Sequence, residues 1–396
     1  MTHSIAATFE RHTLVPGTAH DGLWLGPNFL IEPGVVPRCH RAFFIESDRT
    51  GGDSTQKTFA FAPTQHMPDE LGMHHWRQTW LRRRVPTGLQ RRRDATGHEF
   101  VPSLPWGWHH ASNTGLAVGG VVRHRRGKLA DHVRHLAIAY ATYQPRRSSF
   151  THWESFQIEI DGVPRPSISA CQGLELPDGG LLLPFSVIKN FDGWNSARWV
   201  GTIRCSYNGK KLVPGEVGNL QTHPAPRGFV EPSIAAFGGT FFMTLRAEDG
   251  HGHVATSKDG LHWTEAKPWR WDNGTPIPMD QTMTKFLVHS DGLFLVYTRI
   301  CPEGENVFRY RAPLHVARID PTRPALIRSS ERPVFTSRGY PMGNFQVYTV
   351  SPKESWITVP EWDRTGRDAS CDVLLSRVLW DAPNRILDTG PYPMGG

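Results

Sequence analysis

The sequence predicts an all-β fold: a single six-bladed β-propeller, built of four-stranded antiparallel blades, over residues 1–396. Three observations predict it. The chain is rich in turn-forming residues, it repeats a strand–turn–strand unit, and it contains a second repeated turn motif. Its 396 residues include 38 Gly, 32 Pro, 14 Trp and 20 Phe, which is typical of many short strands joined by tight turns. No helix-length amphipathic segment stands out.

The repeated unit is a run of small or apolar residues, a turn built on Gly, Asp or Pro-Lys, and a second apolar run. Two such runs around a turn indicate a β-hairpin. The units start about 50 to 65 residues apart, which suits one four-stranded blade with its loops. The four clearest copies are 166–186, 231–246, 283–299 and 344–362. A fifth is expected at 113–143, and a sixth from residues 22–80 within a first blade at about 22–110 whose limits are poorly defined.

The second repeated element is a turn motif. TSKDGLHW (256–263) fits the Asp-box pattern Ser-x-Asp-Gly-x-x-Trp through Asp259 and Trp263. Looser copies are MPDELGMHHW (67–76) and SYNGKKL (206–212). We expect the carboxylate to tie down the turn, the Gly to supply a positive φ, and the Trp to pack between blades. These motifs are therefore predicted to be structural.

Composition argues against several other classes of protein. The N-terminus has no basic region followed by an apolar run, so no secretory signal is expected, and no stretch approaches the roughly 18 apolar residues of a membrane span. The five cysteines are scattered without a CxxC pair, which favours reduced thiols in a cytoplasmic protein. The net charge of +7 is interpreted as solvated strands and loops, with no nucleic-acid partner expected.

The sequence lacks the common metal and cofactor motifs. The sequence has no GxGxxG or Walker loop and no GxSxG elbow. HGH (251–253) and the His pairs at 74–75 and 109–110 have no partners at the spacings of zinc ligands. We therefore predict neither a metal nor a cofactor.

Propeller geometry converts the repeat into a predicted site. The first strand of each blade lines the channel and the second returns antiparallel to it, so the start of one and the end of the other meet at one channel mouth. The residues at these places are Glu231, Arg246, Glu248, Asp280, Arg299, Asn344, Gln346 and Glu361. Arg246 and Arg299 occupy equivalent positions and are predicted to converge on one anion, since guanidinium groups bind carboxylates bidentately. Glu231 and Asp280 are the candidate catalytic carboxyls, and the other six are candidate substrate-binding residues.

The stretch FVEPSIAAFGGTFFMTLRAEDGHGHVATSKDGLHWTE (229–265) resembles the third-blade region of the sialidase/neuraminidase superfamily, the six-bladed BNR or Asp-box propellers. The resemblance covers residues 165–365. It implies hydrolysis of terminal sialic acids with retention, by an arginine triad that holds the carboxylate, a Tyr nucleophile activated by a Glu, and an Asp acid/base. By this resemblance Glu231 is the Tyr-activating Glu, Arg246 the second triad arginine and Arg299 the third.

The sequence departs from that family in three places. The segment PRCHRAFF offers Arg38 and Arg41 but lacks the Phe/Tyr-Arg-Ile-Pro motif that carries the first triad arginine. The acid/base Asp is not located. Asn344 stands near the place expected for the nucleophilic Tyr, with Tyr340 and Tyr348 on either side. Another glycosidase scheme would need two carboxylates across the pocket.

Three functions follow and stay open. The favoured one is a glycoside hydrolase that acts on a terminal acidic sugar. The second is a non-catalytic propeller that binds glycan or protein. The third is a polysaccharide lyase in which His109 or His110 acts as the base and the arginines neutralise a uronate.

Overall fold

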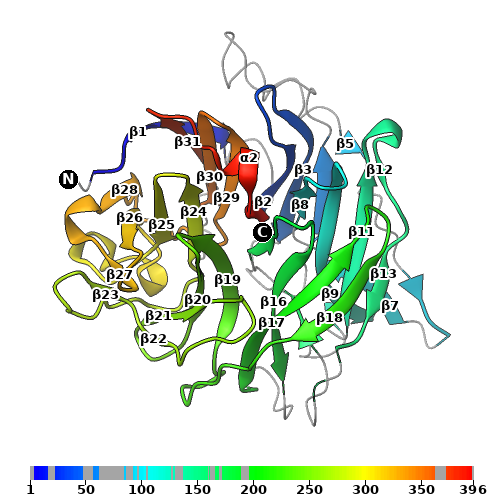
Figure 1. The fold of residues 1–396 in the computed structure, drawn as a ribbon, viewed down its shortest axis with the longest axis horizontal. Helices are drawn as coiled ribbons and strands as arrows, with labels where there is room; N and C mark the ends of the chain where they lie inside the picture. Colours follow the sequence, from blue (N-terminus) through cyan, green and yellow to red (C-terminus); the bar gives the residue numbers. More distant parts are fainter. Residues whose placement is uncertain are drawn as a thin grey trace.

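The computed structural model describes residues 4–16, 23–47, 57–61, 84–85, 92–95, 98–103, 106–125, 128–129, 137–158, 160, 166–168, 172–188, 196–361 and 372–394. Their strands form six sheets disposed around a common centre, as an all-β propeller (Figure 1). Three of these sheets contain four strands each, and the other three contain six, six and eight. The pairs between named strands are antiparallel, except for the parallel pair β23–β27.

The strands are grouped here by sheet, following the chain. The first sheet contains β2 (Leu23–Glu32), β3 (Arg38–Ser47), β4 (Lys57–Phe61) and β5 (Arg84–Val85). The second contains β6 (Arg92–Arg93), β7 (His98–Ser103), β8 (Trp106–His109), β9 (Thr114–Arg125), β10 (Lys128–Leu129), β11 (Ile138–Gln144), β12 (Ser149–Phe150) and β13 (Glu154–Phe156). The third contains β14 (Pro166–Ser167), β15 (Gly173–Glu175), β16 (Leu181–Ile188), β17 (Arg198–Tyr207), β18 (Leu212–Val217) and β32 (Tyr392–Met394).

The remaining sheets carry the second half of the chain. The fourth contains β19 (Val230–Phe237), β20 (Thr240–Arg246), β21 (Gly252–Ser257) and β22 (Lys267–Pro268). The fifth contains β23 (Arg270–Trp271), β24 (Lys285–His289), β25 (Gly292–Tyr297), β26 (Leu314–Asp320), β27 (Ala325–Leu326) and β28 (Arg332–Phe335). The sixth contains β29 (Gln346–Ser351), β30 (Glu354–Pro360), β31 (Val373–Trp380) and β1 (Ala7–Val15). The helical elements are η3 (Pro145–Arg147), η5 (Pro302–Gly304), η6 (Phe308–Tyr310), η7 (Arg328–Ser330) and α2 (Ile386–Thr389).

The predicted hairpins are present. β19–β20, β24–β25 and β29–β30 are antiparallel pairs at the predicted places, and β15–β16 forms the pair within 166–186. The unit expected at 113–143 is also an antiparallel pair, β9–β11, but it does not contain the sheet's innermost strand, because β8 precedes it. In this sheet the predicted unit is therefore shifted by one strand relative to the observed blade, in which β8 precedes β9.

The first and last strands of the fold share one sheet. β1 pairs antiparallel with β31, so the N-terminal strand forms the outer edge of the sheet that contains β29 and β30 (Figure 1). Apolar side chains from that sheet and the β24–β25 sheet form one buried cluster, which includes Val296, Leu314, Ile357 and Val378. Burial of such clusters between neighbouring sheets is the main favourable term for a fold of this kind.

The turn at 256–263 has the construction predicted for it. The Oδ1 atom of Asp259 accepts the backbone N–H groups of Leu261 (2.8 Å) and His262 (2.7 Å), which together hold the pKa of Asp259 below its usual range. Gly260 has a φ of +77°, and the indole of Trp263 donates to Thr202 in the neighbouring sheet (2.9 Å). The turn at Asn208 repeats this bonding, while the copy predicted at 67–76 lies outside the described residues.

Two ends of the hairpins are distinguished below. The end where the innermost strands begin and the second strands finish, at Val230 and Arg246 in the fourth sheet, is called the mouth. The end where the hairpins turn, as at Phe237 and Thr240, is called the turn end.

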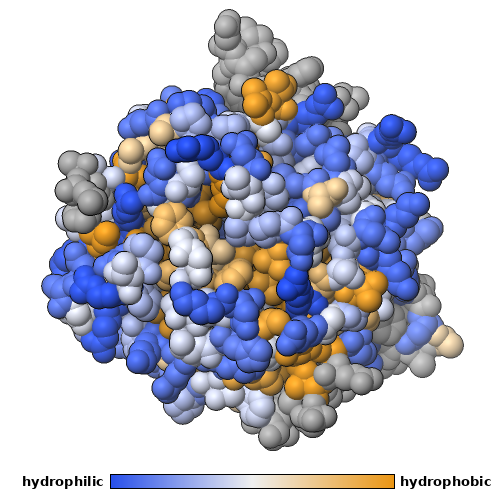
Figure 2. Space-filling model, in the orientation of Figure 1, coloured by the Kyte–Doolittle hydropathy of each residue, from blue (hydrophilic) through white to orange (hydrophobic). Residues whose placement is uncertain are grey.

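The C-terminal segment covers the turn end. Asn384 accepts the backbone N–H of Ser290 (2.9 Å) and donates to the carbonyl of Val288 (2.9 Å) at the β24–β25 turn. β32 then pairs with β15 on its channel side, and α2 lies near the centre of the molecule (Figure 1). On this face hydrophobic side chains gather toward the centre and hydrophilic ones surround them (Figure 2).

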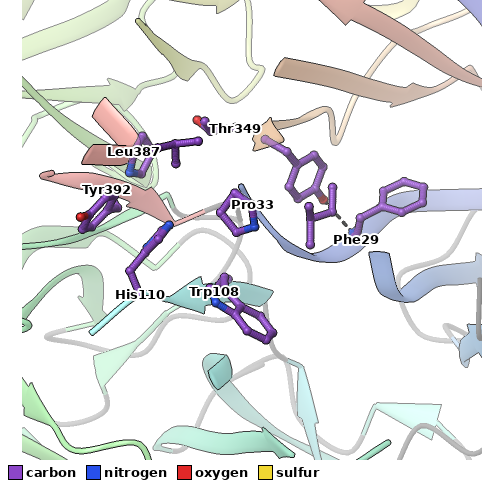
Figure 3. Close-up of a pocket in the computed structure, with 11 residues that line it drawn as sticks. Phe29, Pro33, Trp108, His110, Thr349, Leu387 and Tyr392 are labelled. Carbon is purple, nitrogen blue, oxygen red and sulfur yellow. Dashed lines mark hydrogen bonds between the residues drawn. The ribbon is translucent and has the colours of Figure 1, made fainter. Parts of the chain in front are cut away.

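A small pocket remains beside this segment. Tyr392 of β32 stacks on His110 with ring centroids 3.8 Å apart, and the hydroxyl of Tyr348 accepts the backbone N–H of Phe29 (3.0 Å; Figure 3).

No helix among the described residues has the length and apolar character needed to cross a membrane.

Candidate functional site

The centre of the candidate site is an ion pair at the mouth of the fourth sheet. Arg246 ends β20 and is 7% exposed, and its Nη1 donates to Oε2 of Glu231 at the start of β19 (2.9 Å). Glu231 has a φ of +54°, a left-handed conformation that a glutamate rarely adopts and that often marks a functional position. Burial raises the pKa of Glu231, but Arg246 outweighs it, so the net shift is downward and the carboxyl is ionised.

A second guanidinium that the sequence did not predict lies beside this pair. Arg311 follows η6, donates from Nη2 to the carbonyl of Gln281 (2.8 Å), and lies so close to Gly343 that a Cβ there would come within 2.9 Å of Nη1. Burial, followed by the charge of Arg246, lowers the pKa of Arg311 to about 10, so it remains protonated at neutral pH. Two like charges thus lie beside the carboxylate of Glu231.

Further charges complete the cluster. Arg227 donates to Oε1 of Glu248 (2.9 Å), and Asp280 is one of the opposite charges that act on Arg309 and Arg311. The structure therefore brings four predicted residues together at the mouth: Glu231, Arg246, Glu248 and Asp280. Arg227, Arg309 and Arg311 were not predicted, because Arg227 lies in a loop and the other two lie in or just after η6, away from the strand ends.

Arg299 is not part of this cluster. Its Nε and Nη2 donate to the two carboxylate oxygens of Glu331 (2.8 and 2.9 Å), and Tyr297 donates to the same carboxylate (2.6 Å). Arg299 is therefore held by a residue of its own sheet. The place expected for it, next to Arg246, is occupied by Arg311.

Several buried polar atoms at the mouth have no hydrogen-bond partner. They are Nε of Arg246, Nε of Arg311, Oε1 of Gln281, Oγ1 of Thr282 and Oε1 of Gln346. Gln346 and Thr282 are only 5% and 6% exposed. Since buried polar groups in proteins are nearly always bonded, such a concentration is best explained by a polar ligand or ordered water.

The predicted place of the nucleophile holds Asn344. Asn344 precedes β29 by two residues and has a φ of +58°. Glu231, at the start of β19, has the same left-handed backbone conformation. Of the flanking tyrosines, Tyr348 is buried with its hydroxyl bonded to Phe29, and burial raises its pKa far above the usual range. Neither feature of Tyr348 suits a nucleophile at the mouth.

Glu361 and Arg41 are each held by other groups. Glu361 is bonded to Arg338, which also contacts Asp372 (2.8 Å), and burial raises the pKa of Glu361 against the opposing effect of Arg338. Arg41 donates to the carbonyl of His40 (2.7 Å) and lies over the ring of Tyr143. Arg41 is thus occupied away from the described cluster.

The histidines of the lyase alternative lie at the turn end. His109 is fully buried, contacts Ser112 (2.7 Å) through Nδ1 and contacts the carbonyl of Gly179 (2.9 Å) through Nε2. Nδ1 of His110 contacts the buried carboxylate of Glu175 (3.1 Å). Neither ring faces the arginines at the mouth.

No protein-family model and no curated protein sequence matches the chain significantly. Solved structures do resemble it. A protein of unknown function from Dyadobacter fermentans has a TM-score of 0.55 at 10% identity, covering 91% of this chain and 95% of that one. Trypanosoma rangeli sialidase has a TM-score of 0.56 at 12% identity, covering 94% of this chain and 60% of that one, and its complex with sialic acid has a TM-score of 0.54 at 12% identity, covering 95% and 60%.

These likenesses show the fold: a propeller of the kind found in sialidases. The chain spans about 60% of the length of the Trypanosoma rangeli sialidase. At such identities the comparison does not carry residue roles from one protein to the other.

Proposed function

We propose that this protein binds a terminal acidic sugar at the mouth, through its carboxylate, and hydrolyses the glycosidic bond. One observation carries the proposal: Arg246 and Arg311 lie close together, with the carboxylate of Glu231 beside them and with an unpartnered Nε on each. A second carboxylate, from the sugar, would offset the excess positive charge and accept the free donors.

The unpartnered side chains beside the arginines fit the rest of a sugar. Gln281, Thr282 and Gln346 offer amide and hydroxyl groups, which pair with sugar hydroxyls. The preferred ligand is therefore a sugar acid, such as a sialic or uronic acid, and not an inorganic anion.

For catalysis we assign Glu231 and Asp280. Glu231 is ionised and suits a base, and Asp280, in the loop before β24, is an opposite charge that acts on Arg309 and Arg311. With Asn344 near the place of a Tyr, the proposal is direct attack by water, with one carboxyl as base and the other as acid. This scheme differs from the retaining one that the family resemblance implies.

A second candidate function is glycan binding without turnover. It is favoured by Asn344, because an amide cannot replace a phenolate nucleophile. No observation favours a lyase, given where His109 and His110 lie.

The proposal extends to three broader points. The six sheets are taken as the six blades of a single sialidase-like propeller, and the turn at 256–263 as an Asp box. The partner is a carbohydrate and not a nucleic acid. A cytoplasmic location agrees with the free thiols of Cys39, Cys205 and Cys301.

The test is a panel of aryl glycosides and acidic oligosaccharides with product mass analysis. Hydrolysis adds one water to the products, and Glu231→Gln should abolish it while acidic-sugar binding remains measurable. Saturable binding with no product at high enzyme concentration would replace the hydrolase with the binding function. An unsaturated product would contradict both.

A further inference from the structure

Three potential metal ligands meet beside the mouth from three separate segments. His223 lies in the loop before β19, Asp249 in the turn after β20, and His253 in β21. Oδ2 of Asp249 is 2.9 Å from Nε2 of His253 and 3.4 Å from Nε2 of His223. Ligand atoms around a tetrahedral zinc ion, each about 2.0 to 2.1 Å from the metal, are roughly 3.3 Å apart. The two separations to Asp249 are thus near those of a zinc site, and all three donor atoms lie within 4.8 Å of one another.

The surroundings hold these side chains in place. Oδ1 of Asp249 accepts the backbone N–H of His251 (3.0 Å), which leaves Oδ2 directed at the two rings. The rings of His223 and His253 both pack against Phe229, with centroids 4.9 and 5.2 Å away. In metal sites, the side chains that bind the metal are commonly held in orientation by such neighbouring contacts.

We propose that His223, Asp249 and His253 form a binding site for a zinc-class divalent transition metal ion. Two imidazole nitrogens and one carboxylate favour Zn²⁺ over Ca²⁺ or Mg²⁺, which prefer oxygen ligands. The site is separate from the arginine cluster and does not depend on the proposed glycosidase function.

The site has an open side. The side chains of His223 and Asp249 are 18% and 25% exposed, whereas that of His253 is 3% exposed. A metal ion held by the three residues would therefore keep its fourth position for water or another ligand.

Binding would remove two local hydrogen bonds, and the first is that between Nε2 of His253 and Oδ2 of Asp249 (2.9 Å), whose proton the metal displaces. The backbone N–H of Ala225 donates to Nδ1 of His223 (3.1 Å), and a metal at Nε2 puts the ring proton on Nδ1. The loop must then turn the Ala225 N–H away, so two hydrogen bonds are exchanged for three metal–ligand bonds.

Bracing of the mouth is the expected role of the metal. Asp249 directly follows Glu248, whose carboxylate is paired with Arg227 (2.9 Å). A metal that fixes Asp249 to β21 and to the loop of His223 would hold this turn, and with it the Glu248–Arg227 pair, in one position.

The test is titration of metal-free, full-length protein with Zn²⁺ by calorimetry, and with Co²⁺ by visible absorption. The wild type should bind one ion at this site with the intense bands of tetrahedral Co²⁺. His223→Ala and Asp249→Asn should each weaken this binding by about 100-fold. Both positions are partly exposed, and circular dichroism would verify that the variants fold.

The matched control is His262→Ala. His262 also contacts a carboxylate, with its Nδ1 2.7 Å from Oδ2 of Asp259, but it has no second histidine and its side chain is 72% exposed. Its loss should leave Zn²⁺ affinity unchanged. Equal Zn²⁺ binding by the wild type and His223→Ala, or no binding by the folded wild type at all, would overturn the proposal.

Discussion

The two ends of the innermost strands come from the same hairpins but differ in how their polar groups are satisfied. At the turn end the fully buried Glu175 accepts the backbone N–H groups of His110 (2.7 Å) and Ala111 (2.8 Å). At the mouth Arg246 and Arg311 each keep an unpartnered Nε. One exception at the turn end is Nε2 of His110, which also lacks a partner.

This difference indicates what each end does. At the turn end the carboxylate of Glu175 is hydrogen-bonded and the C-terminal segment is paired with β15, so this end stabilises the fold. The mouth leaves positive charge and polar atoms unsatisfied, a costly arrangement that a ligand would relieve. Changes at the mouth should therefore affect binding, and changes at the turn end should affect stability.

The largest effect is expected from Arg246→Ala and Arg311→Ala. Each removes charged hydrogen bonds to the ligand carboxylate, so affinity for an acidic sugar should fall by about 100-fold or more. Arg299→Ala is the matched control, because Glu331 holds that side chain and acidic-sugar affinity should stay within a few-fold. Calorimetry on the folded variants tests this. Equal losses in all three would mean that Arg299 also contacts the ligand.

Glu175→Ala should produce the next largest effect, on stability alone. It leaves the buried N–H groups of His110 and Ala111 without an acceptor, so stability should fall by about 2 kcal/mol. Urea unfolding measures this loss, with acidic-sugar affinity of the folded fraction as the second readout. A variant as stable as the wild type would contradict the role of Glu175 in stabilising the fold.

A smaller loss of stability is expected from Gly107→Ala. The new Cβ would lie 2.9 Å from Cε and 3.1 Å from Cβ of Met394, a residue of β32. Crowding of this kind costs about 1 kcal/mol. Met394→Ala removes buried contacts of its own, so in the double variant the two losses should be less than additive, and additive losses would show that β32 does not pack there.

The smallest effect concerns pH at the turn end. Nε2 of His289 contacts the carbonyl of Ala382 (3.2 Å) and its Nδ1 accepts the N–H of Asp291 (3.1 Å), which requires a neutral ring. Burial lowers the pKa of His289. The unfolded chain therefore binds a proton more readily, and stability should decline as the pH falls below about 6.5. His289→Gln should flatten that decline between pH 7 and 5, and an unchanged slope would contradict the assignment.

The fold could be predicted because its signal is local. Each hairpin carries its own apolar runs and turn, and the position of Glu231 and Arg246 at the mouth follows from that repeat alone. The turn motif at 256–263 is likewise contained in eight consecutive residues, and its bonding is as expected.

Parts of the site depended on loops and could not be predicted. Arg311 reaches Arg246 from the irregular segment after η6, where no strand register fixes its position. Arg299 lies at the predicted strand end, but it forms an ion pair with Glu331 of its own sheet. His223 lies 26 residues before Asp249, so no ligand spacing revealed their proximity.

Sialic acid and its methyl ester provide a direct test of whether the mouth recognises a sugar carboxylate. Calorimetry would compare sialic acid with its methyl ester, which keeps the hydroxyls and loses the charge, on the wild type and on Arg246→Ala. The wild type should bind the acid about 100-fold more tightly than the ester, and Arg246→Ala should remove most of this preference. Equal affinity of the wild type for both compounds, or an undiminished preference in the variant, would contradict recognition of the carboxylate at the mouth.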